Sequence, residues 1–210
     1  SSAASDVYKR QVMIRTGPHS RLEAFAKESE VPVINGLTND SHPCQVMGDI
    51  MSFIEKRGSI KGTVVTWIGD ANNVLYSWLY AASILGFKVH ISAPPGYSIN
   101  PTQVPDNDDC YDFFLSPEEA AEGADLVTTD NWRSCGYDEN QAKRQSKSAR
   151  WQVNETVMKA AKPDALFMHC LPAFRGQEVS SEVIDGPQSV VWDEAENRCL
   201  LYTSPSPRDR

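Results

Sequence analysis

Polar side chains that could bind a small anion or an amino acid follow almost every predicted strand of this sequence. Because the carboxyl ends of parallel strands share one edge of a sheet, and ligands bind beyond that edge, we expect these side chains to lie together. In chain order the groups are Arg15, Asn35 with Ser41-His42-Pro43-Cys44-Gln45, Gly69-Asp70-Ala71-Asn72-Asn73, Thr129-Asp130, His169-Cys170-Leu171-Pro172 and Asp193-Glu194. Only the strand predicted at residues 87–92 lacks such an ending. The pattern therefore predicts one shared site for a polar ligand.

The start of the helix predicted after the second strand could form an anion site. Asp40 or Ser41 could cap this helix, and Pro43 suits its first turn. His42 and Gln45 would then lie beside free backbone N–H groups, where the helix dipole favours an anion such as phosphate. A plain capped helix with an incidental histidine explains the same residues, so this segment alone leaves both interpretations open.

Two further segments restrict the chemistry. The loop that begins at Gly69 lies where a dinucleotide-binding loop would lie, but it lacks the later glycines of GxGxxG, which disfavours a nicotinamide cofactor. Asn72 in this loop could cap a helix or bind an amino-acid ligand. His169 and Cys170 are direct neighbours, and neighbours on an extended chain point in opposite directions. A polar contact of Cys170 with a substrate is therefore favoured over a nucleophilic Cys–His dyad, with inert packing as the remaining alternative.

The elements that must position these groups alternate between strands and helices. Alternation of this kind implies βαβ units and a parallel sheet. A break near residues 58–62 divides the pattern, so we predict an α/β fold of two doubly wound parallel-sheet lobes, the first truncated, with a ligand cleft at the strand carboxyl ends. Strands are predicted at residues 12–14, 31–34, 63–68, 87–92, 126–128, 165–168 and 190–192, and helices at 22–27, 42–57, 73–85, 118–121 and 153–161.

Composition excludes several classes of protein. A formal net charge of -8 over 210 residues disfavours a nucleic-acid partner, although a few convergent cations suffice for a small anion. The five cysteines are odd in number and form no CxxC pair, so we expect neither a disulfide framework nor a metal site. No apolar run approaches the roughly 20 residues of a membrane span, and no signal-peptide pattern opens the chain. We predict a cytoplasmic protein without a membrane partner.

Both ends of the chain differ in character from the rest. Residues 1–11 and 199–210 show no periodicity continuous with their neighbours and resemble translated sequencing adapters. Natural disordered tails are the alternative. We expect the native fold to lie within residues 12–198.

The motifs taken together resemble a known family. The segment from Val12 to Arg198 is similar to the ornithine carbamoyltransferases, within the aspartate/ornithine carbamoyltransferase superfamily. HPxQ suits the whole superfamily, whereas the HCLP and AENR segments are more specific to the ornithine branch. The motifs are Ser41-His42-Pro43-Cys44-Gln45, Gly69-Asp70-Ala71-Asn72-Asn73, Thr129-Asp130-Asn131-Trp132-Arg133-Ser134-Cys135-Gly136, His169-Cys170-Leu171-Pro172 and Asp193-Glu194-Ala195-Glu196-Asn197-Arg198.

The resemblance implies an activity and a set of site residues. The reaction would transfer a carbamoyl group from carbamoyl phosphate to the δ-amine of ornithine, without a cofactor or a metal, in a homotrimer. Residues 12–57 would be part of a carbamoyl-phosphate-binding domain, and residues 58–198 an ornithine-binding domain. Arg15, His42 and Cys170 would be catalytic. Carbamoyl phosphate would be bound by Arg15, His42, Gln45, Cys170, Leu171 and Arg198, and ornithine by Asn72, Asp130, Ser134 and Cys135.

The sequence departs from the family in ways that leave alternatives open. It lacks the Ser-Thr-Arg-Thr-Arg phosphate loop and ends soon after Arg198, so we expect little or no turnover by this chain alone. Cys135 stands where the family usually has methionine, which puts the contact of that loop with ornithine in doubt. Another carbamoyltransferase, using putrescine, a modified ornithine or aspartate, is one alternative. A non-catalytic amino-acid-binding homologue is another, and the missing glycines disfavour a nucleotide-binding oxidoreductase.

Overall fold

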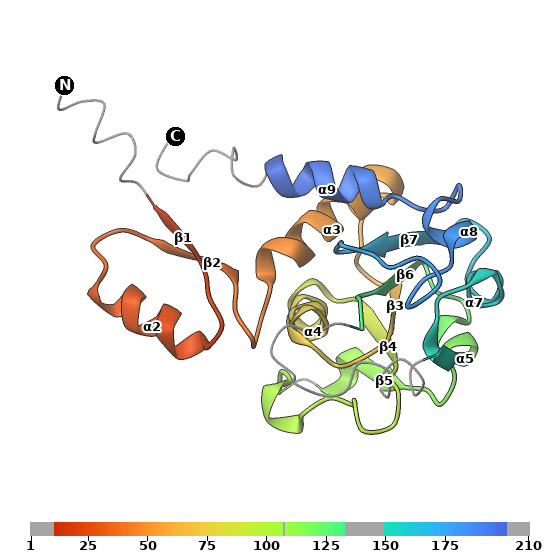
Figure 1. Cartoon of the computed structure of the whole chain (residues 1–210), viewed down its shortest axis with the longest axis horizontal. Helices are drawn as coiled ribbons and strands as arrows, with labels where there is room; N and C mark the ends of the chain where they lie inside the picture. The colour runs from red at the N-terminus through yellow and green to blue at the C-terminus, as the bar shows by residue number, and fades with distance from the viewer. Residues whose placement is uncertain (1–10, 107, 133–148, 201–210) are drawn as a thin grey trace.

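The computed structural model describes residues 11–106, 108–132 and 149–200, and strands alternate with helices along them (Figure 1). The strands are β1 (Val12–Arg15), β2 (Val33–Leu37), β3 (Val64–Ile68), β4 (Lys88–Ser92), β5 (Tyr111–Phe113), β6 (Leu126–Thr129) and β7 (Leu166–His169). The helices are α2 (His19–Glu28), α3 (Pro43–Arg57), α4 (Asn73–Leu85), α5 (Pro117–Ala121), α7 (Glu155–Ala160), α8 (Ser181–Ile184) and α9 (Val191–Leu200). Short 3-10 turns cover Pro101–Gln103, Asp108–Cys110 and Ala149–Trp151.

The strands form two separate parallel sheets. Within the described residues, β1 pairs with β2 through the register Val12↔Val33, and the other strands form a sheet in the order β5-β4-β3-β6-β7. Figure 1 shows β1, β2 and α2 standing apart from the larger lobe, with α3 leading from one to the other. The α/β class and the parallel arrangement are therefore as predicted. The short strand β5 at the edge was not predicted from the sequence.

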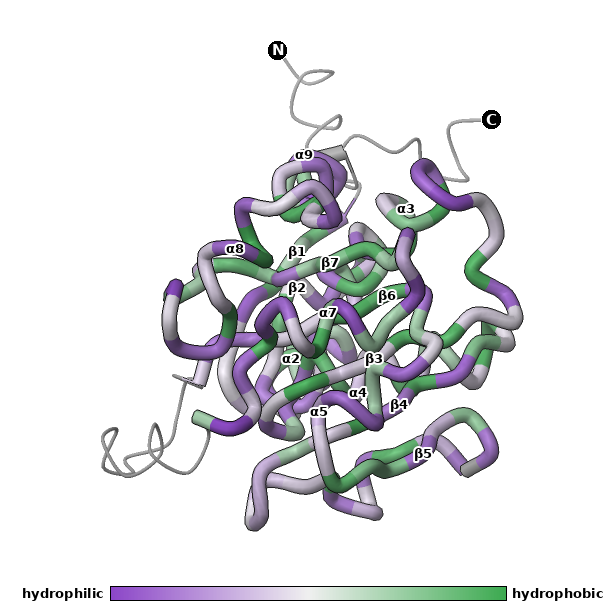
Figure 2. The backbone as a smooth tube through the Cα atoms, turned by 90° about the vertical axis from the view of Figure 1, so that its right-hand side faces the viewer, coloured by the Kyte–Doolittle hydropathy of each residue, from purple (hydrophilic) through white to green (hydrophobic). Residues whose placement is uncertain are grey.

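The large sheet is buried on both faces. Trp67 of β3 packs in one apolar cluster, with Phe53 of α3 and Trp78 of α4. Its neighbour Ile68 packs in a second cluster on the other face, with Phe167 of β7 and Val157 of α7. Adjacent residues of a strand point to opposite faces, so a strand covered on both sides must be apolar throughout. In Figure 2 much of the hydrophobic colour accordingly lies along the central strands.

The helix after β2 begins differently from the prediction. The residue that caps α3 is His42 itself, and its side chain makes no capping hydrogen bond, so the predicted cap at Asp40 or Ser41 was wrong. Pro43 does occupy the first turn. The backbone N–H of His42 instead donates to the Ser77 hydroxyl of α4, at 2.8 Å. This bond fixes the start of α3 against the large lobe.

The strand predicted at residues 190–192 is wrong, because helix α9 begins at Val191. Only Ser189, just before it, forms an isolated parallel bridge with Phe167 of β7. A short apolar run cannot be assigned to a strand or a helix by periodicity alone, whereas the acidic residues Asp193 and Glu194 suit the first turn of a helix. The change matters for the site, because in a helix Glu194 and Arg198 lie on one face.

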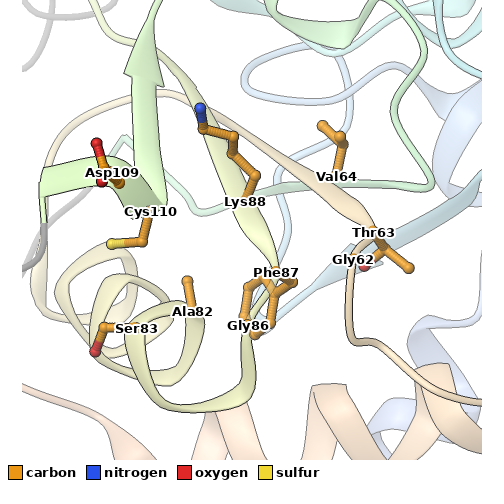
Figure 3. Close-up of a pocket in the computed structure, with 10 residues that line it drawn as sticks. All are labelled: Gly62, Thr63, Val64, Ala82, Ser83, Gly86, Phe87, Lys88, Asp109 and Cys110. Carbon is orange, nitrogen blue, oxygen red and sulfur yellow. The ribbon is translucent and has the colours of Figure 1, made fainter.

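A pocket of about 420 Å³ lies at the amino-terminal end of β3 and β4, opposite the predicted site (Figure 3). Its lining includes Val64 and Lys88, the first residues of the two strands. The ammonium group of Lys88 is already paired with the Asp112 carboxylate, at 2.8 Å. No predicted site residue lines this pocket. Among the described helices, none is both long and apolar enough to cross a membrane.

Candidate active site

The carboxyl ends of β3 and β6 meet where the strand order reverses. The chain leaves β3 toward β4 on one side and later returns to place β6 on the other, which is the topological switch point of the sheet. Ile68 and Thr129, the last residues of the two strands, are paired. Across this point the side-chain N–H of Asn72 donates to Asp130 Oδ2, at 2.6 Å. Two residues predicted for one site therefore meet at the expected place.

Asn72 has two structural tasks at once. It caps α4, because its Oδ1 accepts from the backbone N–H groups of Val74 and Leu75, at 3.0 and 3.1 Å. Its amide nitrogen meanwhile donates to Asp130. Among the described residues, the second N–H of this amide has no hydrogen-bond partner, and through it Asn72 could contact a ligand.

Cys170 lies against Asp130 as a neutral thiol. Its Sγ donates to Asp130 Oδ1 at 3.1 Å, and the same oxygen accepts from the backbone N–H of Asn131 at 2.7 Å. Burial, followed by the charge and the hydrogen bond of Asp130, raises the pKa of Cys170 well above its usual value. A thiol in this state is a poor nucleophile, since the thiolate is the reactive form. The site accordingly suits a polar contact rather than covalent catalysis.

His169 points away from Cys170, as the alternation along a strand predicts. Its Nδ1 accepts from the backbone N–H of Leu171 at 2.9 Å, so Nε2 carries the proton and faces the buried Glu178 carboxylate at 3.2 Å. Glu178 also accepts from the backbone N–H of Phe174 at 2.5 Å. No Cys–His dyad forms, and His169 instead holds the turn in which Leu171 adopts a positive φ of 51°.

Arg198 connects this turn to helix α3. Its Nη1 donates to the backbone carbonyl of Cys170 at 3.0 Å and to Oε1 of Gln45. The amide nitrogen of Gln45 donates to Asp49 Oδ1 at 2.7 Å and to Glu194 Oε1 at 2.6 Å. Both N–H groups of this buried amide are thereby used. Only the remaining lone pair of Oε1 is left for a ligand, so Gln45 can act there only as an acceptor.

Asp49 was not predicted as a site residue, and Glu194 was predicted only as one of the polar strand endings, although both are buried in contact with Gln45. Burial raises the pKa of Asp49 to about 7, and burial together with the Asp49 charge raises the pKa of Glu194 well above its usual value. One sequence signal could have found them. Gln45 and Asp49 on α3, and Glu194 and Arg198 on α9, are each four residues apart and so share a helix face.

His42 is held neutral beside two cations. Burial, and then the charges of Arg198 and Arg15, lower the pKa of His42 to about 4. Its Nδ1 is buried without a partner among the described residues, as is expected of a group that a ligand or a water would satisfy. Arg15 itself is exposed at the end of β1. Its effect on His42 shows that the small lobe brings this cation within electrostatic range of the site.

Five of the predicted site residues thus form two contact chains that meet at Cys170. In one chain the Sγ of Cys170 donates to Asp130, which also accepts from Asn72. In the other the carbonyl of Cys170 accepts from Arg198, which also donates to Gln45. Leu171 is next in sequence and packs against the second apolar cluster. Ser134 and Cys135 lie outside the described residues. The cleft between the lobes stays a prediction, and the described residues contain no group of three His, Cys, Asp or Glu side chains that could hold a metal ion.

Two family models match the chain, one for each predicted domain. Residues 3–55 match the aspartate/ornithine carbamoyltransferase carbamoyl-P binding domain. Residues 61–203 match the Asp/Orn binding domain of the same family. The first match ends at residue 55 and the second begins at residue 61.

Curated relatives are similar over most of the chain. The ornithine carbamoyltransferase of Herminiimonas arsenicoxydans is 59% identical over 187 residues, which are 89% of this chain and 62% of the relative. That of Ralstonia pickettii (strain 12J) is 57% identical over 188 residues, which are 89% of this chain and 61% of the relative. The chain therefore spans about three fifths of the length of these relatives.

Solved structures are similar to this chain in fold as well as in sequence. The ornithine carbamoyltransferase of Burkholderia thailandensis E264 superposes with a TM-score of 0.85 at 50% identity, over 95% of this chain and 66% of that one. The enzyme of Pyrococcus furiosus gives a TM-score of 0.84 at 41% identity, over 94% of this chain and 66% of that one. With both family domains matched in order and the fold shared, the chain belongs to the aspartate/ornithine carbamoyltransferase family.

Proposed function

We propose that this protein takes part in the transfer of a carbamoyl group from carbamoyl phosphate to the δ-amine of L-ornithine, giving L-citrulline and phosphate. The observation that carries the proposal is the meeting of the two contact chains at Cys170. One chain offers a carboxylate and an amide, which suit the charged groups of an amino acid. The other offers a guanidinium beside an amide oxygen, which suit a phosphate and a carbamoyl NH2. The two substrates would thus lie next to each other.

On the carbamoyl phosphate side, the charges of Arg15 and Arg198 would bind the phosphate oxygens. Gln45 Oε1 would accept from the carbamoyl NH2, because its amide nitrogen is already occupied by Asp49 and Glu194. His42, neutral at physiological pH, would donate to the carbonyl oxygen rather than act as a cation. The pocket would then hold donors in place for the charge that develops on that oxygen.

On the ornithine side, Asp130 would bind an ammonium group and Asn72 would contact the amino-acid backbone. The uncharged δ-amine would attack the carbonyl carbon, the new N–C bond would form as the C–O bond to phosphate breaks, and phosphate would leave with the electron pair. The amine would lose one proton, which phosphate is basic enough to accept. Cys170, as a protonated thiol, would remain a hydrogen-bond donor throughout.

Ligand binding to the 210-residue chain tests this proposal without requiring turnover. The probe is phosphonoacetamide, in which CH2 replaces the bridging oxygen of carbamoyl phosphate, and binding is measured by isothermal titration calorimetry. Ornithine is then added to the complex, with putrescine, N-acetylornithine and aspartate as matched alternatives. We expect the tightest binding for ornithine, because Asp130 and Asn72 suit free α-amino and carboxylate groups. A preference for another acceptor, or no binding of phosphonoacetamide at all, would contradict the proposal.

Assembly and location follow from the family rather than from contacts in this chain. We propose a homotrimer for the intact protein, in the cytoplasm, as the resemblance implies. Light scattering of the purified protein gives the mass of the assembly directly, and a monomer or a dimer would count against the trimer.

A further inference from the structure

A buried polar cluster joins helices α3 and α9 beneath the proposed site. It consists of Gln45, Asp49, Glu194 and Arg198, and we call it the carboxyl clamp. The side-chain nitrogen of Gln45 donates to both carboxyl groups, at 2.7 and 2.6 Å. Asp49 and Glu194 are almost completely buried, with 2% of each residue exposed. Two acidic groups are rarely placed in so dry an environment unless they are held by specific partners.

The two carboxyl groups need one proton between them. Asp49 Oδ1 and Glu194 Oε1 both accept from the single amide nitrogen of Gln45, at 2.7 and 2.6 Å, so the two buried carboxyl groups lie too close together for both to be ionised, and one of the two is protonated. The pair then carries a single negative charge. Arg198 lies beside it with one positive charge and bonds to the amide oxygen of Gln45. Charge and hydrogen bonding are both balanced in this state, which a buried ionic cluster requires.

The clamp fixes which end of Gln45 faces the ligand. If the amide were reversed, its oxygen would face two carboxyl groups that have one proton between them, and its nitrogen would face a guanidinium, so at least two of the three contacts would become unfavourable. The clamp also holds the chain after β7, because Glu194 Oε2 accepts from the backbone N–H of His169 at 3.0 Å. Nη1 of Arg198 donates to the backbone carbonyl of Cys170, the next residue, at 3.0 Å. Gln45 and the turn of Cys170 are therefore set by the same pair of acids.

We propose that Asp49 and Glu194 are positioning residues for the carbamoyl group: by sharing one proton they present Gln45 Oε1 as an acceptor, and so select an NH2 group over a methyl group on the acyl phosphate. This inference rests on the proposed function, since it concerns the same ligand. Neither acid touches the ligand, and each acts through Gln45 or Arg198. The selection is against acetyl-type phosphates, whose methyl group cannot donate to the amide oxygen.

Two substitutions of Asp49 test whether the hydrogen-bond pattern around the shared proton holds Gln45 in place. Asp49→Asn keeps the pattern, because the new amide accepts from Gln45 with its oxygen and donates to Glu194 with its nitrogen. It also keeps the single negative charge, now fixed on Glu194. Asp49→Ala removes one of the two acceptors of the Gln45 amide nitrogen, together with the partner that shares the proton of Glu194, and so weakens the hold on the orientation of Gln45. We expect Asp49→Asn to behave like the unchanged chain near neutral pH and Asp49→Ala to lose the selection.

The ligand-free measurement uses the side-chain amide signals of the 210-residue chain in 1H–15N spectra, with the Gln45 signal assigned by its loss in Gln45→Leu. In the unchanged chain this signal should be protected from solvent exchange and should move with pH as the shared proton is lost. In Asp49→Asn it should stay protected and should not move over the same range. Arg198 is the remaining charged member of the clamp, and Cys170 is the titratable group that faces it, with His42 and Asp130 one contact further away. These groups are present in both proteins, so their effects cancel in the comparison.

The ligand measurement compares phosphonoacetamide with 2-oxopropylphosphonate, in which a methyl group replaces the NH2 group. We expect the unchanged chain and Asp49→Asn to prefer the amide by about tenfold, the effect of one hydrogen bond in a dry site, and Asp49→Ala to bind both alike. Loss of the preference in Asp49→Asn, or its retention in Asp49→Ala, would overturn the proposal. If neither ligand binds the unchanged chain, the proposed function and the selection both fail, whereas the amide spectra still decide whether the shared proton exists. If the ligands bind but the Gln45 signal neither titrates nor is protected, the clamp alone is refuted.

Discussion

At the scale of single residues, three groups of the candidate site have pKa values shifted in the direction that keeps them uncharged. His42 is neutral, the thiol of Cys170 is protonated, and Asp49 holds a proton up to near neutral pH. Burial is the largest cause in each case, and neighbouring charges add to it. His42 and Cys170 are then uncharged, and the Asp49–Glu194 pair carries one buried negative charge. The positive charges that an anion would meet are therefore those of Arg15 and Arg198.

The Cys170 thiol should become more reactive when the charge of Asp130 is removed. In Asp130→Asn the negative charge and the ionised acceptor are lost, so the pKa of Cys170 should fall toward its usual value and its alkylation by iodoacetamide should accelerate. Peptide mass spectrometry resolves Cys170 from the other cysteines. Asp185→Asn, which removes an exposed carboxylate paired with Arg175, serves as the control. An unchanged alkylation rate in Asp130→Asn would show that burial alone protects the thiol.

Lowering the pH should change the contributions of His42 and Asp49 to the free energy of unfolding in opposite directions. The pKa of His42 is lower in the folded state than its usual 6.5, so the unfolded state binds the proton more readily and stability is lost as the pH falls from about 6.5 toward about 4. The pKa of Asp49 is raised from 3.8 to about 7, so its contribution is full at low pH and is lost as the pH rises through about 7.

Urea unfolding of single variants between about pH 4 and about pH 7 tests the direction of both stability changes. Relative to the unchanged chain, His42→Asn should become more stable as the pH falls below about 6.5, and Asp49→Asn should become less stable as the pH falls below about 7. Because the two effects oppose each other, the free energy of unfolding should change less with pH in the unchanged chain than in either variant. Parallel curves for all three proteins would show that neither group is perturbed in the folded state.

At the scale of elements, the site is built from the ends of strands and the starts of helices. The cap of α4 is also the partner of Asp130, so one asparagine couples helix stability to the site. Asn154 makes the same cap on α7, accepting from the backbone N–H groups of Thr156 and Val157, but it has no bond to a site residue. These two caps form a matched pair.

Asn72→Ala and Asn154→Ala should cost similar stability but differ in ligand binding. Each loses one helix cap, which is worth about 1 kcal/mol in urea unfolding. Asn72→Ala should in addition weaken ornithine binding to the phosphonoacetamide complex by about tenfold, because Asp130 Oδ2 loses the hydrogen bond from Asn72. Calorimetry supplies the affinities. Equal affinities in the two variants would mean that Asn72 serves only as a cap.

The elements predicted well from the sequence are those with strong local signals. Helix α4 has an asparagine cap at Asn72, a long apolar run and Gly86 in the left-handed conformation at its end, and it was predicted with its observed bounds. Helix α9 was missed because only the first residues of an amphipathic helix were taken as a short apolar strand. Asp49 was missed, and Glu194 was given no role of its own, for a related reason. Their importance depends on two helices meeting, and no local pattern in either helix shows which partner it has.

At the scale of the whole molecule, the two lobes differ sharply in how much core they have. The large lobe contains two apolar clusters, one on each face of its sheet. In the described part of the small lobe before α3, Leu22 is the one hydrophobic side chain that is buried. A sheet with so few strands and so little buried apolar surface is marginal by itself. Arg15 is therefore carried by the less stable part of the chain.

Hydrogen exchange followed by mass spectrometry should reveal this difference directly. Amides of β1 and β2 should exchange through local opening, while those of β3, β6 and β7, buried on both faces, should exchange only near the global unfolding limit. If Arg15 binds the phosphate group as proposed, phosphonoacetamide should slow exchange in β1 and β2 more than in the large sheet, because the ligand then stabilises the closed state of the weaker lobe. Arg15→Gln should abolish that selective protection while leaving the exchange of β3 unchanged. Slow exchange of β1 and β2 without ligand would contradict the marginal stability of the small lobe, and protection that survives Arg15→Gln would remove Arg15 from the phosphate site.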